Sequence, residues 1–172
     1  MVLSDDIRER VRAYIQHQGA KSREAIIDLV RTSQTKYVDL VSAVPGAIID
    51  SKPTPEEWSI RELTLHVITA EDGVTRVIET TSRGGSVALG DRVLGLKKDD
   101  DGRPFAELVA QLRDANARLL AAIRDLPAEP DTSATVQHPF FGPLNCLEWA
   151  VFQRVHDEDH IQHAGKIVAA LG

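Results

Sequence analysis

Apolar residues recur at helical spacing over four long parts of the chain, which predicts four helical segments. The first covers about residues 5–43, and its apolar positions are Ile7, Val11, Ile15, Ile26, Ile27, Val30, Tyr37 and Val41. Gly19, followed by the possible helix-capping residue Ser22, predicts a break or kink near residue 20. This segment is therefore expected to be one bent helix or two helices.

The second and fourth segments have the most clearly marked starts. Ser59 and Glu62 form a capping-box pattern behind the turn-forming stretch KPTPEEW, which predicts a helix over about residues 59–82. Asn145 and Glu148 repeat this three-residue spacing at the start of the last segment. The fourth helix is therefore expected to run from there to the end of the chain.

A third helix is expected over about residues 103–126. The stretch before it, RGGSVALGDRVLGLKKDDDGR, is too long for a simple connection and is interpreted as a bundle crossover or a cover. A short extended piece is expected at residues 135–137 and a turn at residues 141–143. The whole pattern predicts an all-α fold, a bundle of about four helices in a single domain over residues 1–172.

Three histidines, His156, His160 and His163, share one narrow face of the fourth predicted helix at about 100° per residue. Apolar residues such as Trp149 continue this stripe, so the imidazoles are expected to point inward, away from a polar side that includes Asp157. Buried imidazoles are costly without partners, because each carries a donor and an acceptor. A bound cation removes that cost, so the stripe indicates a metal site.

A metal site needs ligands from a second helix, and His66 is the candidate. His66 lies in the middle of the second predicted helix, where Ala70 and Gly73 leave space beside it. Facing helices of a bundle approach within about 8 to 10 Å. His66 is therefore expected to meet His156 and His160 around one ion.

The other histidines and the single cysteine have simpler interpretations. His138 is expected in a loop, although it could reach the mouth of the site, and His17 is expected on the surface. Cys146 lies about 15 Å along the helix from the histidines and off their stripe, so it is interpreted as a packed cysteine.

Several further residues remain open in their roles. His163 is a candidate for a fourth ligand, for a group that supports the ligands from behind, or for a hydrogen-bonding partner of a substrate. Trp149 is expected as a core anchor and as the floor of a pocket. Glu71, Asp72 and Asp159 are candidate supports or bases, with solvent-exposed helix surface as the simpler interpretation of each.

The composition narrows the classes of partner. The net charge of −6 and the pI of about 5.5 give no electrostatic footprint for nucleic acid or an anionic membrane. No apolar stretch approaches the roughly 20 residues of a membrane helix, and the N-terminus has no secretory pattern. A single cysteine excludes an internal disulfide. We therefore expect a cytoplasmic protein whose partners are small molecules or proteins.

Two stretches carry a resemblance to a known family. PEEWSIRELTLHVITAED, followed about ninety residues later by FGPLNCLEWAVFQRVHDEDHIQH, resembles the DinB/YfiT superfamily. The resemblance covers about residues 22–171, and the H-x3-H pair with its FGPL lead-in is its most specific part. It implies a four-helix bundle with up-down-down-up topology, and it makes His66, His156 and His160 the metal ligands. The family pattern ends at H-x3-H, which favours the supporting role for His163.

The resemblance also implies zinc or nickel as the metal, sometimes another divalent ion, and frequent homodimers. Enzymes of the superfamily are thiol S-transferases and isomerases that use bacillithiol, mycothiol or a related low-molecular-weight thiol. It therefore implies a metal-dependent transferase that acts on small electrophiles in detoxification or stress. Three neutral imidazoles would leave a cation its full double charge, which favours the deprotonated form of a thiol or water.

Two other interpretations remain open. The first is a non-catalytic bundle, a binding or regulatory module in which the ion only ties two helices together. A fourth protein ligand, for which His163 is the obvious candidate, would favour this structural ion, and an open coordination position would favour the enzyme. The second is a metal-free scaffold whose protonated histidines bind an anionic ligand.

Overall fold

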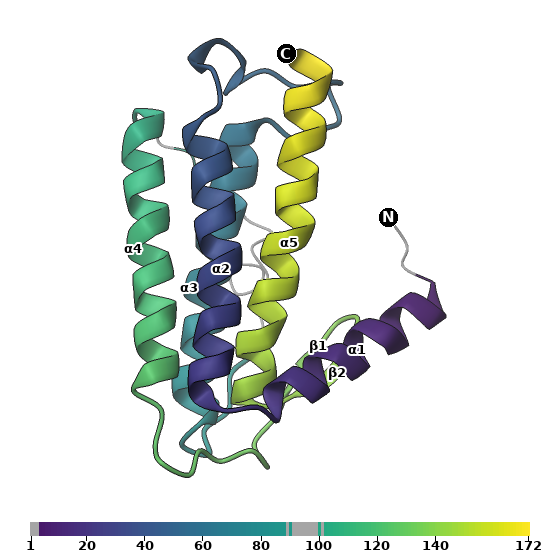
Figure 1. The fold of residues 1–172 in the computed structure, drawn as a ribbon, viewed down its shortest axis with the longest axis vertical. Helices are drawn as coiled ribbons and strands as arrows, with labels where there is room; N and C mark the ends of the chain where they lie inside the picture. The colour runs from purple at the N-terminus through teal and green to yellow at the C-terminus, as the bar shows by residue number, and fades with distance from the viewer. Residues whose placement is uncertain (1–3, 89, 91–99, 101) are drawn as a thin grey trace.

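Four long helices form a bundle in the computed structural model, which describes residues 4–88, 90, 100 and 102–172. These helices are α2 (Arg23–Ser42), α3 (Ile60–Thr81), α4 (Phe105–Arg124) and α5 (Cys146–Leu171). In Figure 1, α2 and α5 run upward, whereas α3 and α4 run downward. The predicted all-α bundle with up-down-down-up topology is confirmed. No helix in the described part of the chain is long and apolar enough to cross a membrane.

The first predicted segment consists of two helices. The shorter one is α1 (Asp5–Gly19). Its C-terminal end meets the lower end of the bundle, and its axis makes a large angle with the long helices (Figure 1). A new helix then starts at Ser22, whose hydroxyl accepts a hydrogen bond from the amide of Ala25 at 3.3 Å. A Cβ atom on Gly19 would lie only 3.1 Å from Cγ of Glu148, so glycine lets the end of α1 pack closely against the start of α5.

Both predicted capping boxes are present, and they fix the starts of the two helices that carry the candidate ligands. In α3, the Ser59 hydroxyl accepts from the Glu62 amide at 3.2 Å, and the Glu62 carboxylate accepts from the Ser59 amide at 3.0 Å. In α5, the side chain of Asn145 accepts from the Glu148 amide at 3.1 Å, and the return bond is 2.9 Å long. Each box satisfies amides that would otherwise lack partners at a helix start.

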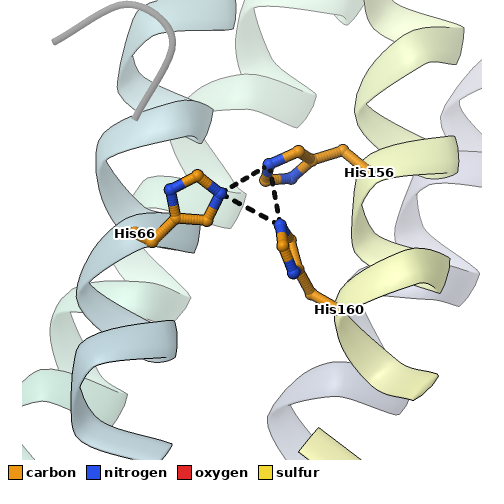
Figure 2. A group of neighbouring side chains, drawn as sticks. All are labelled: His66, His156 and His160. Atoms are coloured by element: carbon orange, nitrogen blue, oxygen red, sulfur yellow. Dashed lines mark hydrogen bonds between the residues drawn. The ribbon is translucent and has the colours of Figure 1, made fainter. Parts of the chain in front are cut away.

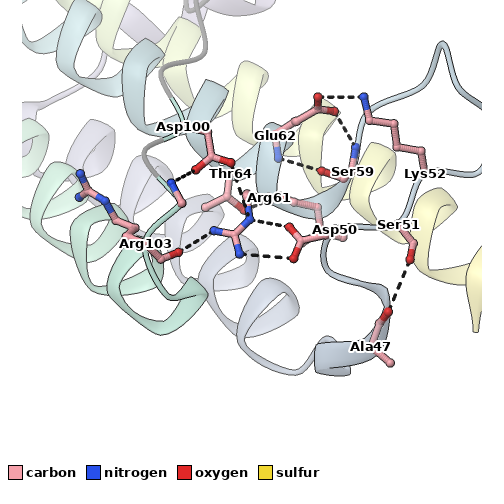
Figure 3. A network of polar contacts seen from close by, with 12 residues as sticks. Ala47, Asp50, Ser51, Lys52, Ser59, Arg61, Glu62, Thr64, Asp100 and Arg103 are labelled. Carbon is pink, nitrogen blue, oxygen red and sulfur yellow. Dashed lines mark hydrogen bonds and ion pairs between the residues drawn. The ribbon is translucent and has the colours of Figure 1, made fainter.

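Arg61 holds together three segments at the end of the bundle where α3 and α4 begin (Figure 3). Its guanidinium contacts both carboxylate oxygens of Asp50, which lies just after the short helix η1 (Gly46–Ile48). It also donates to the carbonyl oxygen of Arg103 at 2.8 Å and lies 3.9 Å from the carboxylate of Asp100. These contacts fix the first turn of α3 relative to the start of α4.

A short hairpin precedes α5. Strands β1 (Val136–His138) and β2 (Gly142–Leu144) pair antiparallel, with His138 opposite Gly142. The extended piece is present one residue later than expected, at 136–138 and not 135–137, and the turn lies at residues 139–141 and not at 141–143. The turn precedes the expected position because Gly142 pairs with His138 as the first residue of β2. The predicted long connection before α4 lies mostly outside the described residues.

Two separate apolar clusters fill the bundle, one toward each end of its helices. The lower cluster includes Ile26, Val30, Val77, Leu119, Ile123 and Trp149. The upper cluster includes Tyr37, Leu63, Leu108, Leu112, Ala164 and Ile167. The middle third of each long helix contributes polar side chains to the space between them.

We call this region the polar layer, and it consists of Gln34, Glu71, Asn116 and Asp157, one residue from each helix of the bundle. All four are at most 9% exposed. The Gln34 amide donates to Glu71 Oε1 at 3.1 Å. With the Asn116 amide nitrogen turned toward Glu71, it donates to the two carboxylate oxygens at 3.0 and 2.8 Å. Polar groups from three helices therefore meet at one carboxyl group.

The expected exposure of two carboxylates was wrong. Glu71 is 0% and Asp157 is 1% exposed. Their burial is possible because side chains of α2 donate hydrogen bonds to both: the amide of Gln34 to Glu71 and the hydroxyl of Ser33 to Asp157. Asp72 and Asp159 lie on the surface as expected. Burial raises the pKa of Glu71 well above its usual range, and the nearby Asp157 carboxylate adds to this effect. Burial also raises the pKa of Asp157 to about 7.

The raised pKa of Glu71 predicts a specific dependence of stability on pH. An acid whose pKa is higher in the folded state contributes most stability below its unfolded pKa, and this contribution is lost as the pH rises through the folded pKa. We therefore expect Glu71→Gln, which stays neutral, to gain stability relative to wild type between pH 5 and pH 9. Urea unfolding of the metal-free proteins at both pH values measures this gain.

The matched control for this prediction is Glu79→Gln, which neutralises an exposed carboxylate of the same helix. Its difference from wild type should change little with pH. A Glu71→Gln difference that is equally constant between pH 5 and pH 9 would contradict the assignment of a raised pKa to Glu71.

Candidate metal centre

Three imidazole nitrogens converge between α3 and α5 (Figure 2). The Nε2 atom of His66 lies 3.0 Å from Nε2 of His156 and 3.0 Å from Nε2 of His160. The third side of this triangle, between His156 and His160, measures 3.1 Å. His66 and His160 are buried and His156 is half-buried. The structure therefore brings together the three histidines that the sequence singled out, and we call them the histidine triad.

The histidine triad fits a divalent cation. Nitrogens that bind one ion at roughly 2.0 to 2.1 Å lie about 2.9 Å apart at right-angled coordination and about 3.4 Å apart at tetrahedral coordination. The observed separations of 3.0 to 3.1 Å fall between these limits. Borderline-soft ions such as zinc and nickel suit imidazole donors of this kind.

The electrostatics of the triad also favour a cation. Burial, followed by the neighbouring imidazoles, lowers the pKa of His156 well below its usual value. Burial likewise lowers the pKa of His160 to about 3. Near neutral pH both rings are uncharged, and an uncharged imidazole offers the lone pair that a metal requires. Lone pairs that face one another at 3 Å need a shared proton or cation between them.

His163 lies outside the histidine triad. Its half-buried ring is centred 6.1 Å from the ring of His160 and 6.0 Å from that of Trp58. Among the described residues, the group that could hold a metal consists of the triad alone. No fourth protein ligand therefore comes from this part of the chain.

The sequence interpretation assigned the pocket to Trp149 and did not place Trp58 beside the histidines. Its half-buried indole meets the ring of His66 edge-on, with centroids 4.9 Å apart. Trp58 directly precedes the capping residue Ser59, a position from which an apolar side chain can fold back along the first turns of a helix. That position was the signal available in the sequence. Trp58 forms one wall beside the triad.

Phe152 lies beside another member of the triad, and the structure does not bring Trp149 to the triad. The ring of Phe152 is centred 5.8 Å from that of His156. Trp149 is 1% exposed and lies behind Phe152, with 5.3 Å between their ring centroids. Its indole nitrogen donates to the carbonyl oxygen of Val136 at 3.3 Å. Trp149 is a core residue, as expected, but Phe152 intervenes between it and the ligands.

The expectation of a loop position for His138 was wrong. His138 belongs to β1, is 4% exposed, and stacks on Phe141 with ring centroids 4.8 Å apart. Its Nδ1 atom accepts hydrogen bonds from the amides of Phe140 and Phe141 at 3.1 and 3.2 Å, so it is tied into the hairpin turn. Burial lowers its pKa to about 4. Cys146 is buried and His17 is exposed, as expected.

Gln153 and Ser33 lie on the side of His156 away from the triad, and the sequence interpretation did not identify either of them. The amide nitrogen of Gln153 lies 3.4 Å from Nδ1 of His156 and donates to Oδ1 of Asp157 at 2.7 Å. The hydroxyl of Ser33 donates to the other carboxylate oxygen of Asp157 at 2.9 Å. The candidate ligand His156 is therefore connected to the polar layer and to α2.

Comparisons with known proteins agree with this architecture. The family model of the DinB superfamily matches residues 29–164. Among solved structures, the chain is similar to TT2238, described as a four-helix bundle protein, with 22% identity and a TM-score of 0.62 over 83% of this chain and 97% of that one. It is also similar to YfiT from Bacillus subtilis, with 14% identity and a TM-score of 0.66 over 87% of each chain. YfiT is described as a probable metal-dependent hydrolase with an unusual four-helix bundle topology. No curated protein matches the chain.

The geometry predicts that removal of either a ligand of α3 or a ligand of α5 abolishes tight metal binding. We expect His66→Ala and His160→Ala to bind zinc or nickel more than about 100-fold more weakly than wild type, since loss of outer partners alone costs 10- to 100-fold. His163→Ala should keep wild-type affinity, because its ring lies outside the triad. Elemental analysis of protein purified without chelator, followed by titration calorimetry, measures both quantities.

Two results would count against the metal centre. One is wild-type protein that carries no stoichiometric divalent metal and binds none in titration. The other is a His66→Ala variant whose metal content equals that of wild type.

Proposed function

The chain belongs to the DinB superfamily, and from this membership and the geometry of its three histidines we propose that it is a metal-dependent enzyme acting on small molecules. The ligands are His66, His156 and His160, and the metal is zinc or nickel. The observation that carries the proposal is the convergence of three buried or half-buried Nε2 atoms within 3.1 Å of one another.

The position of His163 favours an enzyme over a purely structural ion. Structural zinc sites are closed by four protein ligands, whereas catalytic sites keep a position for water or substrate. The described residues supply three imidazoles, and His163 lies too far away to be a fourth. This arrangement supports an ion with open positions.

The protein side chains have separate tasks at this site. Burial lowers the pKa of His156 and His160, so both rings are uncharged near neutral pH and can donate a lone pair to a metal ion. Trp58 and Phe152 flank the triad with aromatic rings, which limits access of bulk water and offers apolar contact to a substrate. A divalent cation held by three neutral ligands keeps its full double charge and favours the deprotonated form of a thiol or water beside it.

The reaction we propose is transfer of a low-molecular-weight thiol, of the bacillithiol or mycothiol type, to a small electrophile. In this reaction the thiol sulfur forms a bond to an electrophilic carbon, the bond from that carbon to its leaving group breaks, and the thiol proton is released. The resemblance of the WSIRELTLH and H-x3-H stretches to the DinB/YfiT superfamily, whose enzymes include thiol S-transferases, supports this choice.

Hydrolysis is the second candidate function. The observation that favours it is the similarity to YfiT, described as a probable metal-dependent hydrolase, over 87% of each chain. Water would take the place of the thiol as the nucleophile, and the same side chains would hold the metal and flank the site.

One assay distinguishes these functions. Zinc- and nickel-loaded protein is incubated with an activated aryl halide or an activated ester, each with and without a low-molecular-weight thiol, and the products are identified by mass spectrometry. Thiol transfer predicts a thioether or thioester that forms only when thiol is present. Hydrolysis predicts the same alcohol or acid product with or without thiol.

His160→Ala should lower kcat/KM by more than about 100-fold, because loss of transition-state stabilisation appears directly in this ratio. The matched control is His17→Ala, which removes an exposed histidine of α1 and should leave kcat/KM unchanged. Loaded wild-type protein that forms neither product would instead favour a non-catalytic bundle.

A further inference from the structure

Gln153 occupies an unusual place between a candidate ligand and a buried carboxylate. It is 0% exposed, and its Nε2 atom lies 2.7 Å from Oδ1 of Asp157 and 3.4 Å from Nδ1 of His156. Asp157 is held on its other side by the hydroxyl of Ser33, which donates at 2.9 Å. The amide of Gln153 is therefore the only side chain among the described residues that links His156 to this carboxylate.

One atom of Gln153 is left unsatisfied. Its carbonyl oxygen Oε1 is buried and has no hydrogen-bond partner among the described residues. A buried acceptor without a partner destabilises the folded protein, so native proteins rarely retain one without a reason. The structure thus contains a spare acceptor beside the ring of His156.

A metal-bound imidazole at position 156 would provide the hydrogen-bond donor that Oε1 of Gln153 lacks. When a neutral histidine binds a cation through Nε2, its single proton resides on Nδ1, and this N–H group needs an acceptor. The Nε2 atom of His156 points into the triad, and its Nδ1 atom points toward Gln153. The nitrogen of the Gln153 amide cannot accept this hydrogen bond, but the oxygen can.

We propose that Gln153 is a positioning residue for the metal: its Oε1 atom accepts a hydrogen bond from Nδ1–H of His156 while its Nε2 atom donates to Asp157. The inference rests on the proposed metal site. In the structure the Nε2 atom of Gln153 lies beside both groups, so the proposal requires Oε1 to take its place beside Nδ1 while Nε2 stays on Asp157. The carboxylate, the amide and the imidazole then form one chain of hydrogen bonds.

This chain has two effects on the ligand. It fixes the tautomer and the orientation of the His156 ring, and the carboxyl group of Asp157, as hydrogen-bond acceptor, polarises the amide, which makes the imidazole a better donor to a cation. His160 differs, because its buried Nδ1 atom has no partner among the described residues. Of the two ligands on α5, His156 is therefore the one that the protein supports from behind.

The test compares two equivalent substitutions. Gln153→Met keeps the length of the side chain and removes its amide, and we expect a 10- to 100-fold weaker affinity for zinc, the range typical of lost partners behind a ligand. Gln34→Met is the matched control, since Gln34 is equally buried but bonds to Glu71 and not to a ligand. It should lower stability while it leaves zinc affinity within about twofold of wild type.

A swap of partners provides the rescue. The double variant Gln153→Glu with Asp157→Asn keeps one carboxyl group and one amide in the pair. The carboxylate at position 153 can accept from both His156 and the amide at position 157, and the amide oxygen at 157 can accept from Ser33. Zinc affinity should therefore return to within a few-fold of wild type. A merely structural role for Gln153 would not predict this recovery.

A spectroscopic measurement on the unmodified protein avoids any problem of folding. In zinc-loaded protein labelled with ¹⁵N-histidine, the Nδ1–H proton of His156 should be visible and protected from solvent exchange, and Gln153→Met should remove this protection. The inference is overturned if the wild-type signal is unprotected, or if Gln153→Met and Gln34→Met bind zinc equally well. Failure of wild type to bind any metal overturns the proposed function as well, whereas these two results leave it intact.

Discussion

The centre of this molecule is organised by the need to satisfy polar groups that water cannot reach. A bundle buries the middle of its helices most deeply, and each polar side chain placed there requires a partner from another helix. The carboxylate of Glu71 accepts hydrogen bonds from the side-chain amides of Gln34 and Asn116. That of Asp157 accepts hydrogen bonds from Ser33 and Gln153. The three imidazole nitrogens of the triad face one another under the same requirement. A cation between them satisfies all three at once.

The polar layer and the candidate metal centre are two parts of one arrangement. They are adjacent on α5, which contributes to both through neighbouring residues, His156 to the triad and Asp157 to the polar layer. Helix α2 supplies no ligand, yet it reaches His156 through Ser33, Asp157 and Gln153 in turn. A helix that contributes no histidine to the triad is thus connected to the candidate site through hydrogen bonds.

Features encoded locally were predictable from the sequence, and features that depend on other helices were not. The helix starts at Ser59 and Asn145 follow from short capping patterns, and the shared face of His156 and His160 follows from helical periodicity. Glu71 and Asp157 look like surface carboxylates in any single-helix pattern, because their partners lie far away in the chain. The aromatic neighbours of the triad depend on both kinds of information: the position of Trp58 directly before Ser59 places its side chain along the first turns of α3, but only the packing of α5 against α3 shows that Trp58 and not Trp149 contacts a histidine of the triad.

The division of the core into two apolar clusters has a consequence for how the protein fluctuates. Apolar contacts supply most of the cooperativity of a small domain, and here they are interrupted at the height of the polar layer. Each half of the bundle therefore approaches an independent unit of local unfolding, with its own free energy of opening and its own hydrogen-exchange protection. His156 and His160 lie between Val155, which packs against the lower cluster, and Ile161, which packs against the upper one, so that transient opening of either half would expose the candidate site while the other half keeps its fold.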